Sequence, residues 1–212
     1  MIETEKQLSE LLNRTKRFHR AVAVQISNLT PYGDERFTVA FQAGVLSIEH
    51  AIAALMLIGN ELNASGYALF RPQFETLVRG VWLLHAASDI WVDKLNEPLT
   101  IESARRANSS LMLADMLKQL DNSAAPKHLI DQLKEFRDVT WKDLNSYIHG
   151  GIHPLSRMLS GYPPHLSYDV LRNSNALVAI AAQLTAIATG DKNNMTPVHK
   201  IHKDFADCLP II

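Results

Sequence analysis

Apolar residues recur at helical spacing along most of this chain, and no segment alternates apolar and polar residues convincingly. Helical signals lie near residues 2–29, 34–63, 66–87, 90–96, 100–120, 126–149, 167–190 and 198–208, the fourth and the last being short. Short connections between long helices favour antiparallel neighbours. The pattern therefore predicts an all-α, single-domain bundle of about six or seven helices, mostly antiparallel, over residues 1–212.

Capping residues and turn signals set the expected limits of several helices. Asp34 is a good N-cap for the second helix, and Pro126 suits the first turn of the sixth. Ser167 is expected to cap the seventh. Residues 150–164, which include a clear loop at 160–164, form the only connection long enough to shape the rim of a pocket.

Size and charge exclude several classes of protein. A chain of 212 residues can bury one sizeable core, and a net charge of −1 favours neither nucleic acid nor an anionic membrane. The single cysteine, Cys208, excludes a disulfide framework and favours a reducing compartment. The polar start lacks the apolar run of a signal peptide, and the apolar runs at residues 51–58 and 176–189 are shorter than the ~20 residues of a membrane span. We therefore expect a cytoplasmic protein without membrane contact.

Three charged residues recur every four positions inside the long apolar segment at residues 66–87. Arg71, Glu75 and Arg79 lie along one strip of the predicted helix, with Trp82 further along the same edge. Charges beside an apolar face are costly to desolvate unless they are paired or serve a ligand. The strip is then a buried Arg–Glu–Arg brace, an anion pocket in which Glu75 orients the arginines, or a set of exposed ion pairs worth about 0.3–0.5 kcal/mol each.

A second polar ladder precedes the glycine pair at positions 150 and 151. Its members, again four residues apart, are Arg137, Trp141, Asn145 and His149. At a helix C-terminus, the helix dipole favours the protonated form of His149. Two roles stay open for His149: a structural or solvated side chain, or a general acid/base or ligand contact.

A metal site is not expected. Pro154 disfavours a helical conformation for His153, so His149 and His153 do not have the geometry of a metal pair. The chain has no Glu-x-x-His motif, no cysteine pair, no phosphate-binding glycine loop and no Gly-x-Ser-x-Gly. We predict no metal and no cofactor.

At the two ladders the chain resembles a loose group of uncharacterised bacterial all-helical families near abortive-infection and HEPN-like domains. The resemblance rests on Arg71, Glu75 and Trp82 and on the segment Asn-Ser-Tyr-Ile-His-Gly at residues 145–150, and it covers roughly residues 40–150. HEPN-like ribonucleases carry an arginine and a histidine on one helix with four to six residues between them, and they act without metal. Here Lys142 and His149, with six residues between them, match that pattern. Lysine lacks the planar fork of arginine, so impaired catalysis is expected.

The resemblance implies an RNA-acting protein of bacterial defence or toxin–antitoxin type, in which His149 transfers protons. The candidate catalytic residues are His149, Lys142 and Asn145, and the candidate ligand-binding residues are Arg71, Glu75, Arg79, Arg137 and Trp82. Two other functions stay open: a non-enzymatic helical interaction module braced by the Arg–Glu–Arg strip, and a small-anion sensor that uses the same arginines. The expected partner is RNA or another protein, and we expect a homodimer because helical bundles often pair through an apolar face.

Overall fold

The computed structural model describes residues 2–107 and 111–210. Within these ranges it contains eleven α-helices, two short 3-10 helices and no strand. The all-α class is confirmed, but the predicted number of six or seven helices is too low. The α-helices are α1 (Ile2–Ile26), α2 (Glu35–Gly59), α3 (Asn63–Ala68), α4 (Phe70–His85), α5 (Asp89–Asn96), α6 (Ile101–Ala107), α7 (Leu113–Leu120), α8 (Lys127–Ile148), α9 (Ile152–Ser160), α10 (Pro164–Ile187) and α11 (Met195–Asp204), and the 3-10 helices are Lys192–Asn194 and Ala206–Cys208.

The extra helices arise where a predicted segment is broken or a predicted loop is helical. The segment at 66–87 is divided into α3 and α4 at Leu69, because Pro72 has no N–H to donate to Ala68 four residues earlier. The segment at 100–120 becomes α6 and α7, on either side of residues 108–110, which lie outside the described residues.

Residues 150–164 were predicted to be a loop, and this prediction is wrong because α9 occupies most of the segment. Pro154 is the third residue of α9, where the backbone N–H groups lack partners within the helix in any case. His153 is accordingly helical, contrary to the prediction. Ser167 does not cap α10, which begins at Pro164; its hydroxyl instead lies 2.6 Å from that of Tyr67.

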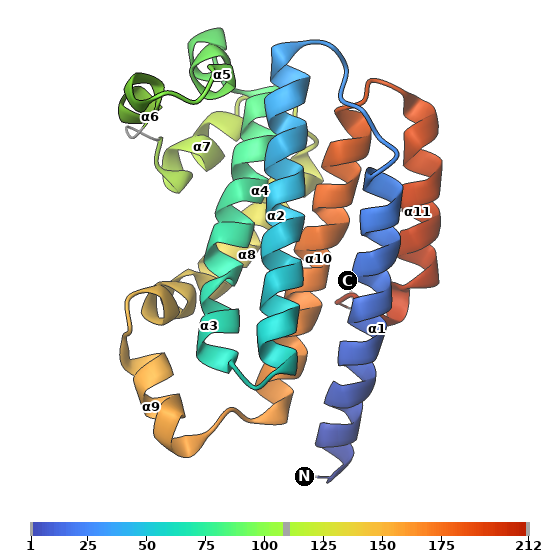
Figure 1. Cartoon of the computed structure of the whole chain (residues 1–212), viewed down its shortest axis with the longest axis vertical. Coiled ribbons are helices and arrows are strands. Elements are labelled where there is room, and N and C mark those ends of the chain that lie inside the picture. Colours follow the sequence, from blue (N-terminus) through green and yellow to red (C-terminus); the bar gives the residue numbers. More distant parts are fainter. Residues whose placement is uncertain (1, 108–110, 211–212) are drawn as a thin grey trace.

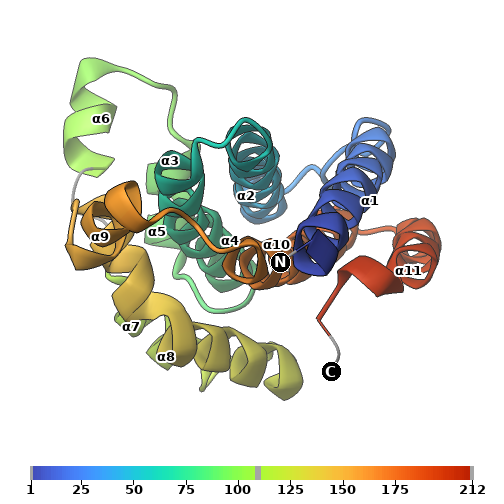
Figure 2. The same cartoon turned by 90° about the horizontal axis from the view of Figure 1, so that it is seen from below.

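The centre of the molecule is formed by α2, α4 and α10, which pack against one another. Figure 1 shows these helices running along the long axis, with α1 and α11 beside α10. The short helices α5, α6 and α7 gather at the upper end in that view, and α3 and α9 lie at the lower end. Seen from below, α8 lies along one side of the bundle and leads into α9 (Figure 2).

A buried polar network links the three central helices. The side chain of Gln73 is fully buried, and its Nε2 donates to the backbone oxygen of Ser174 at 3.0 Å. Ser174 Oγ donates to Gln73 Oε1 at 2.8 Å, and Ser47 Oγ donates to the Gln73 backbone oxygen at 2.9 Å. Because each of these buried groups has a partner, the network fixes the relative register of α2, α4 and α10.

Helix α2 is, within the described residues, the one helix long and apolar enough to cross a membrane by length and composition. We expected no membrane span because the apolar runs at residues 51–58 and 176–189 are short. Helix α2 contains the first of these runs and is longer than either. In the structure α2 packs against α4 and α10, and Ile48, Ala51 and Ile58 on it belong to the hydrophobic core. A core helix passes the same test of length and composition.

Candidate functional site

On α4, Glu75 holds one of the two arginines of its strip. Arg71 Nε donates to Glu75 Oε1 at 2.9 Å, and the two side chains are 22% and 32% exposed. Arg79 is half-buried and forms no hydrogen bond or ion pair through its side chain with any residue that the structure describes. Glu75 therefore pairs with Arg71 alone, and the pair is too exposed to act as the buried Arg–Glu–Arg brace.

Helix α8 completes the environment of Arg71 with two side chains from its polar ladder. Arg71 Nη1 lies 3.3 Å from His149 Nε2, and the guanidinium carbon lies 4.7 Å from the centre of the Trp141 ring. Arginine can only donate, so in a hydrogen bond across this contact Nε2 is the acceptor. We call Arg71, Glu75, Trp141 and His149 the Arg71–His149 site.

Packing between α4 and α8 explains why these residues meet. The rings of Phe74 and Phe136 pack with their centres 4.7 Å apart and join the two helices beneath the site. His149 ends α8 and donates its backbone N–H to the Asn145 oxygen at 3.1 Å, and Gly150 follows with a positive φ of 61°. A glycine adopts this backbone conformation without steric cost, so the helix ends with the imidazole beside α4.

Asn145 lies between Trp141 and His149 on the same strip of α8. Its Oδ1 atom is buried and has no hydrogen-bond partner among the residues that the structure describes. An unpaired buried acceptor is costly, by about 1–3 kcal/mol, until a donor reaches it. The α8 strip thus offers an indole ring, an amide with an unpaired acceptor and an imidazole in succession, and Arg71 reaches it from α4.

The other predicted site residues lie elsewhere. Trp82 is buried, donates to Gln119 Oε1 at 2.8 Å and packs on Trp91, so it belongs to the core between α4 and α7. Arg137 pairs with its neighbour Asp138 at 2.8 Å. Lys142 is exposed and forms no ion pair with a described residue, and it precedes His149 by two turns on one side of α8.

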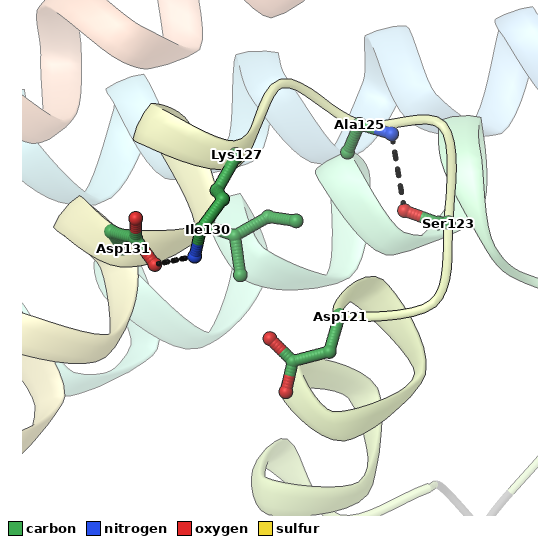
Figure 3. A pocket seen from close by; sticks show the side chains of 6 residues that line it. All are labelled: Asp121, Ser123, Ala125, Lys127, Ile130 and Asp131. Atoms are coloured by element: carbon green, nitrogen blue, oxygen red, sulfur yellow. Dashed lines mark hydrogen bonds and ion pairs between the residues drawn. The ribbon is translucent and has the colours of Figure 1, made fainter.

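A small hollow at the connection between α7 and α8 is a poorer candidate. It has a volume of about 220 Å³ and is lined by Asp121, Ser123, Ala125, Lys127, Ile130 and Asp131 (Figure 3). Lys127 donates to Asp131 at 3.1 Å, and Lys134 donates to Asp121. Its carboxylates are thus already neutralised, and none of the predicted site residues lines it.

The Arg71–His149 site can bind an anion and move a proton. The arginine is held by a carboxylate and an aromatic ring, and the exposed imidazole beside it has an acceptor nitrogen. The spacing of both ladders indicated most of these residues, but it assigned no role to Trp141. The signal for Trp141 was its distance of eight residues from His149, which places both on one side of α8.

One family model matches the chain over residues 44–211, from α2 to the last 3-10 helix, and it describes a family of unknown function (DUF6988). No curated protein and no solved structure matches.

Proposed function

Because the chain belongs to the DUF6988 family, whose function is unknown, we propose its function from the site: a HEPN-like RNA-acting protein of bacterial defence or toxin–antitoxin type. The observation that carries this proposal is the contact between Arg71 and His149. A cation next to a neutral imidazole suits a phosphodiester that is to be cleaved beside a hydroxyl group.

The proposed reaction is attack by a ribose 2′-hydroxyl on the adjacent phosphorus. His149 Nε2 takes the proton from the 2′-oxygen as the new O–P bond forms, and the bond from phosphorus to the 5′-oxygen breaks. The 5′-oxygen leaves with a proton from water, the hydroxide that remains takes the proton from His149, and Arg71 offsets the negative charge that builds up on the phosphate oxygens. Arg71 exchanges its contact with His149 for the phosphate in this step.

The arginine in this proposal comes from α4 and not from the helix that carries the histidine. Glu75 and Trp141 hold the guanidinium of Arg71 in place, which lowers the entropy lost when a phosphate binds. Lys142 is exposed and serves as a second phosphate contact. Arg79, which follows Glu75 on the same strip of α4, extends the phosphate path along that helix.

The test is cleavage of structured and single-stranded RNAs by the purified protein in EDTA. Cleavage by the wild type is expected, with a loss of about 10²–10⁴-fold in His149→Ala and a comparable loss in Arg71→Gln. His128→Ala, which removes an exposed histidine near the other end of α8, and Arg20→Gln on α1 are matched controls that should leave the rate unchanged. A broad RNA panel left intact by the wild type overturns the proposal. A thermal shift with inorganic phosphate but no cleavage assigns the site to a small-anion sensor.

A non-enzymatic interaction module is the second candidate, and α9 favours it. The helix exposes Ile152, Leu155, Met158 and Leu159, the last 95% accessible. Exposed apolar residues along one helix commonly mark a protein interface. We propose that this face joins two copies in a homodimer. Sedimentation should detect a dimer of the wild type, and Leu155→Glu and Leu159→Glu should convert it to a monomer. A wild type that stays monomeric at high concentration refutes the homodimer.

A further inference from the structure

A second, larger cavity lies on the other side of α8 from the Arg71–His149 site. It has a volume of about 380 Å³ and opens between α8 and α10, with α9 at one end. Phe136, Thr140, Asp143 and Tyr147 line it at helical spacing, whereas Trp141 and His149 lie on a different face of α8. Figure 2 shows the course of α8 along the flank of the bundle, set apart from α10.

Most of the cavity wall is apolar. Phe70 from α4 and Phe136 from α8 face Leu166 and Val170 from α10 across it. A volume of this size matches the lower range of small-molecule sites, which is about 300–1,000 Å³, and such sites usually combine an apolar wall with a few polar groups.

An arginine and two tyrosines lie at the end formed by α9. Arg157 lines the cavity, is partly buried and has no ion pair with any residue in the described part of the chain. Tyr67 and Tyr147 line the cavity with ring centres 5.2 Å apart, and Tyr162, which does not line it, packs on Tyr67 at 5.3 Å. The hydroxyl of Tyr162 is buried and has no hydrogen-bond partner among the described residues.

The tyrosine hydroxyls remain donors at neutral pH. Burial raises the pKa of both Tyr67 and Tyr147 to about 12; the bond to Ser167 opposes the rise at Tyr67, and the positive charge of Arg157 opposes it at both. The opposing influence places the guanidinium within electrostatic reach of these hydroxyls. The Tyr67 hydroxyl is already bonded to Ser167, so the α9 end presents one cation and the Tyr147 hydroxyl, which together suit an anionic group.

Two carboxylates also line the cavity, and neither neutralises Arg157. Asp143 lies 3.3 Å from His153 Nε2, and Asp169 lies exposed on α10. A carboxylate that is open to water interacts weakly with a ligand charge, whereas the partly buried guanidinium interacts more strongly.

We propose that this cavity binds a small amphipathic carboxylic acid, with its carboxylate on Arg157 and the Tyr147 hydroxyl and its apolar body between Phe136 and Val170. The site is separate from the one that carries the RNA proposal. A failure of one proposal therefore leaves the other standing.

The test is calorimetric titration of the full chain with decanoate and decylamine below their micelle concentrations and with decanol below its solubility limit. Decanoate should bind more tightly than decanol, and Arg157→Gln should weaken decanoate roughly tenfold while leaving decanol unchanged. Arg20→Gln, an exposed arginine on α1, should change neither affinity.

A cavity-filling variant, Val170→Trp, should abolish decanoate binding while the circular dichroism spectrum stays that of the wild type. The proposal is overturned if decanoate does not bind, if decanol binds equally well, if decylamine binds more tightly than decanoate, or if Arg157→Gln leaves the decanoate affinity unchanged.

Discussion

Arg71 on α4 and His149 at the end of α8, 78 residues apart in sequence, meet with 3.3 Å between Nη1 and Nε2. Neither helix holds both members of this pair. The contact exists because Phe74 and Phe136 pack α4 on α8 and because α8 ends at the histidine. Any change that shifts α8 along α4 should therefore separate the pair without touching either residue.

Replacing Glu75 with glutamine should have a small effect on stability and a larger one on ligand binding. The amide keeps an oxygen for Arg71 Nε but loses the charge. Because both side chains are partly exposed, the free energy of unfolding in urea should fall by no more than about 1 kcal/mol. Affinity for RNA should fall because Arg71 is held less firmly. A loss of about 3–5 kcal/mol would show that the pair acts as a buried brace.

The sequence could predict which residues share a helix face, but not which helices meet. Four-residue spacing placed Arg71, Glu75 and Arg79 on one strip, because that follows from the helix period alone. Which arginine Glu75 holds depends on the neighbouring helix α8, because Trp141 on that helix stacks on Arg71. Arg79 has no such neighbour and no described side-chain partner. The distinction is set by tertiary packing and has no local sequence signal.

Breaker residues misled the prediction around α9. Pro154 and the glycines at 150 and 151 indicated a loop, yet a proline in the first turn of a helix displaces no intrahelical hydrogen bond. Because α9 was not predicted, the larger cavity between α8 and α10 could not be predicted either, since Arg157 and His153 in its wall lie on α9. The cavity depends on residues from α3, α4, α8, α9 and α10, whose meeting no single segment encodes.

Replacing Gly80 with alanine should destabilise the fold despite the better helix propensity of alanine. A Cβ atom there would lie 2.7 Å from Leu184 Cδ2, 3.1 Å from Ala43 Cβ and 3.3 Å from the Ala40 oxygen. The alanine and backbone atoms cannot turn away, so α2 and α4 must separate. We expect a loss of roughly 1–3 kcal/mol in urea denaturation, larger than the gain of about 1 kcal/mol from propensity.

The matched control for Gly80 is Gly59 at the end of α2, where a Cβ atom would meet nothing within 4 Å. Gly59→Ala should leave stability unchanged or raise it by up to about 1 kcal/mol. Equal stability of the two variants would contradict the close approach of α2 and α4.

His19 on α1 lies in a buried network with α10 and the last 3-10 helix. Its Nε2 donates to Asn175 Oδ1 at 3.0 Å, and Asn175 Nδ2 donates to Thr15 Oγ1 at 2.8 Å and to the Cys208 oxygen at 3.0 Å. Burial lowers the pKa of His19 from 6.5 to about 4, and the bond to Asn175 opposes this shift. The folded state therefore keeps the imidazole neutral where the unfolded chain is already protonated.

Stability should consequently fall as the pH is lowered through this window. Above pH 6.5, the pKa of His19 in the unfolded chain, His19 is neutral in both states and its contribution to the free energy of unfolding is complete. Between pH 6.5 and about 4 only the unfolded state binds the proton, so this contribution is lost progressively. The total loss from His19 is on the order of 3 kcal/mol.

Urea denaturation at a series of pH values from 7.5 downward should show this loss. His19→Gln should flatten the slope, whereas His128→Gln, an exposed histidine, should keep it. An unchanged slope in His19→Gln would assign the acid sensitivity to other groups.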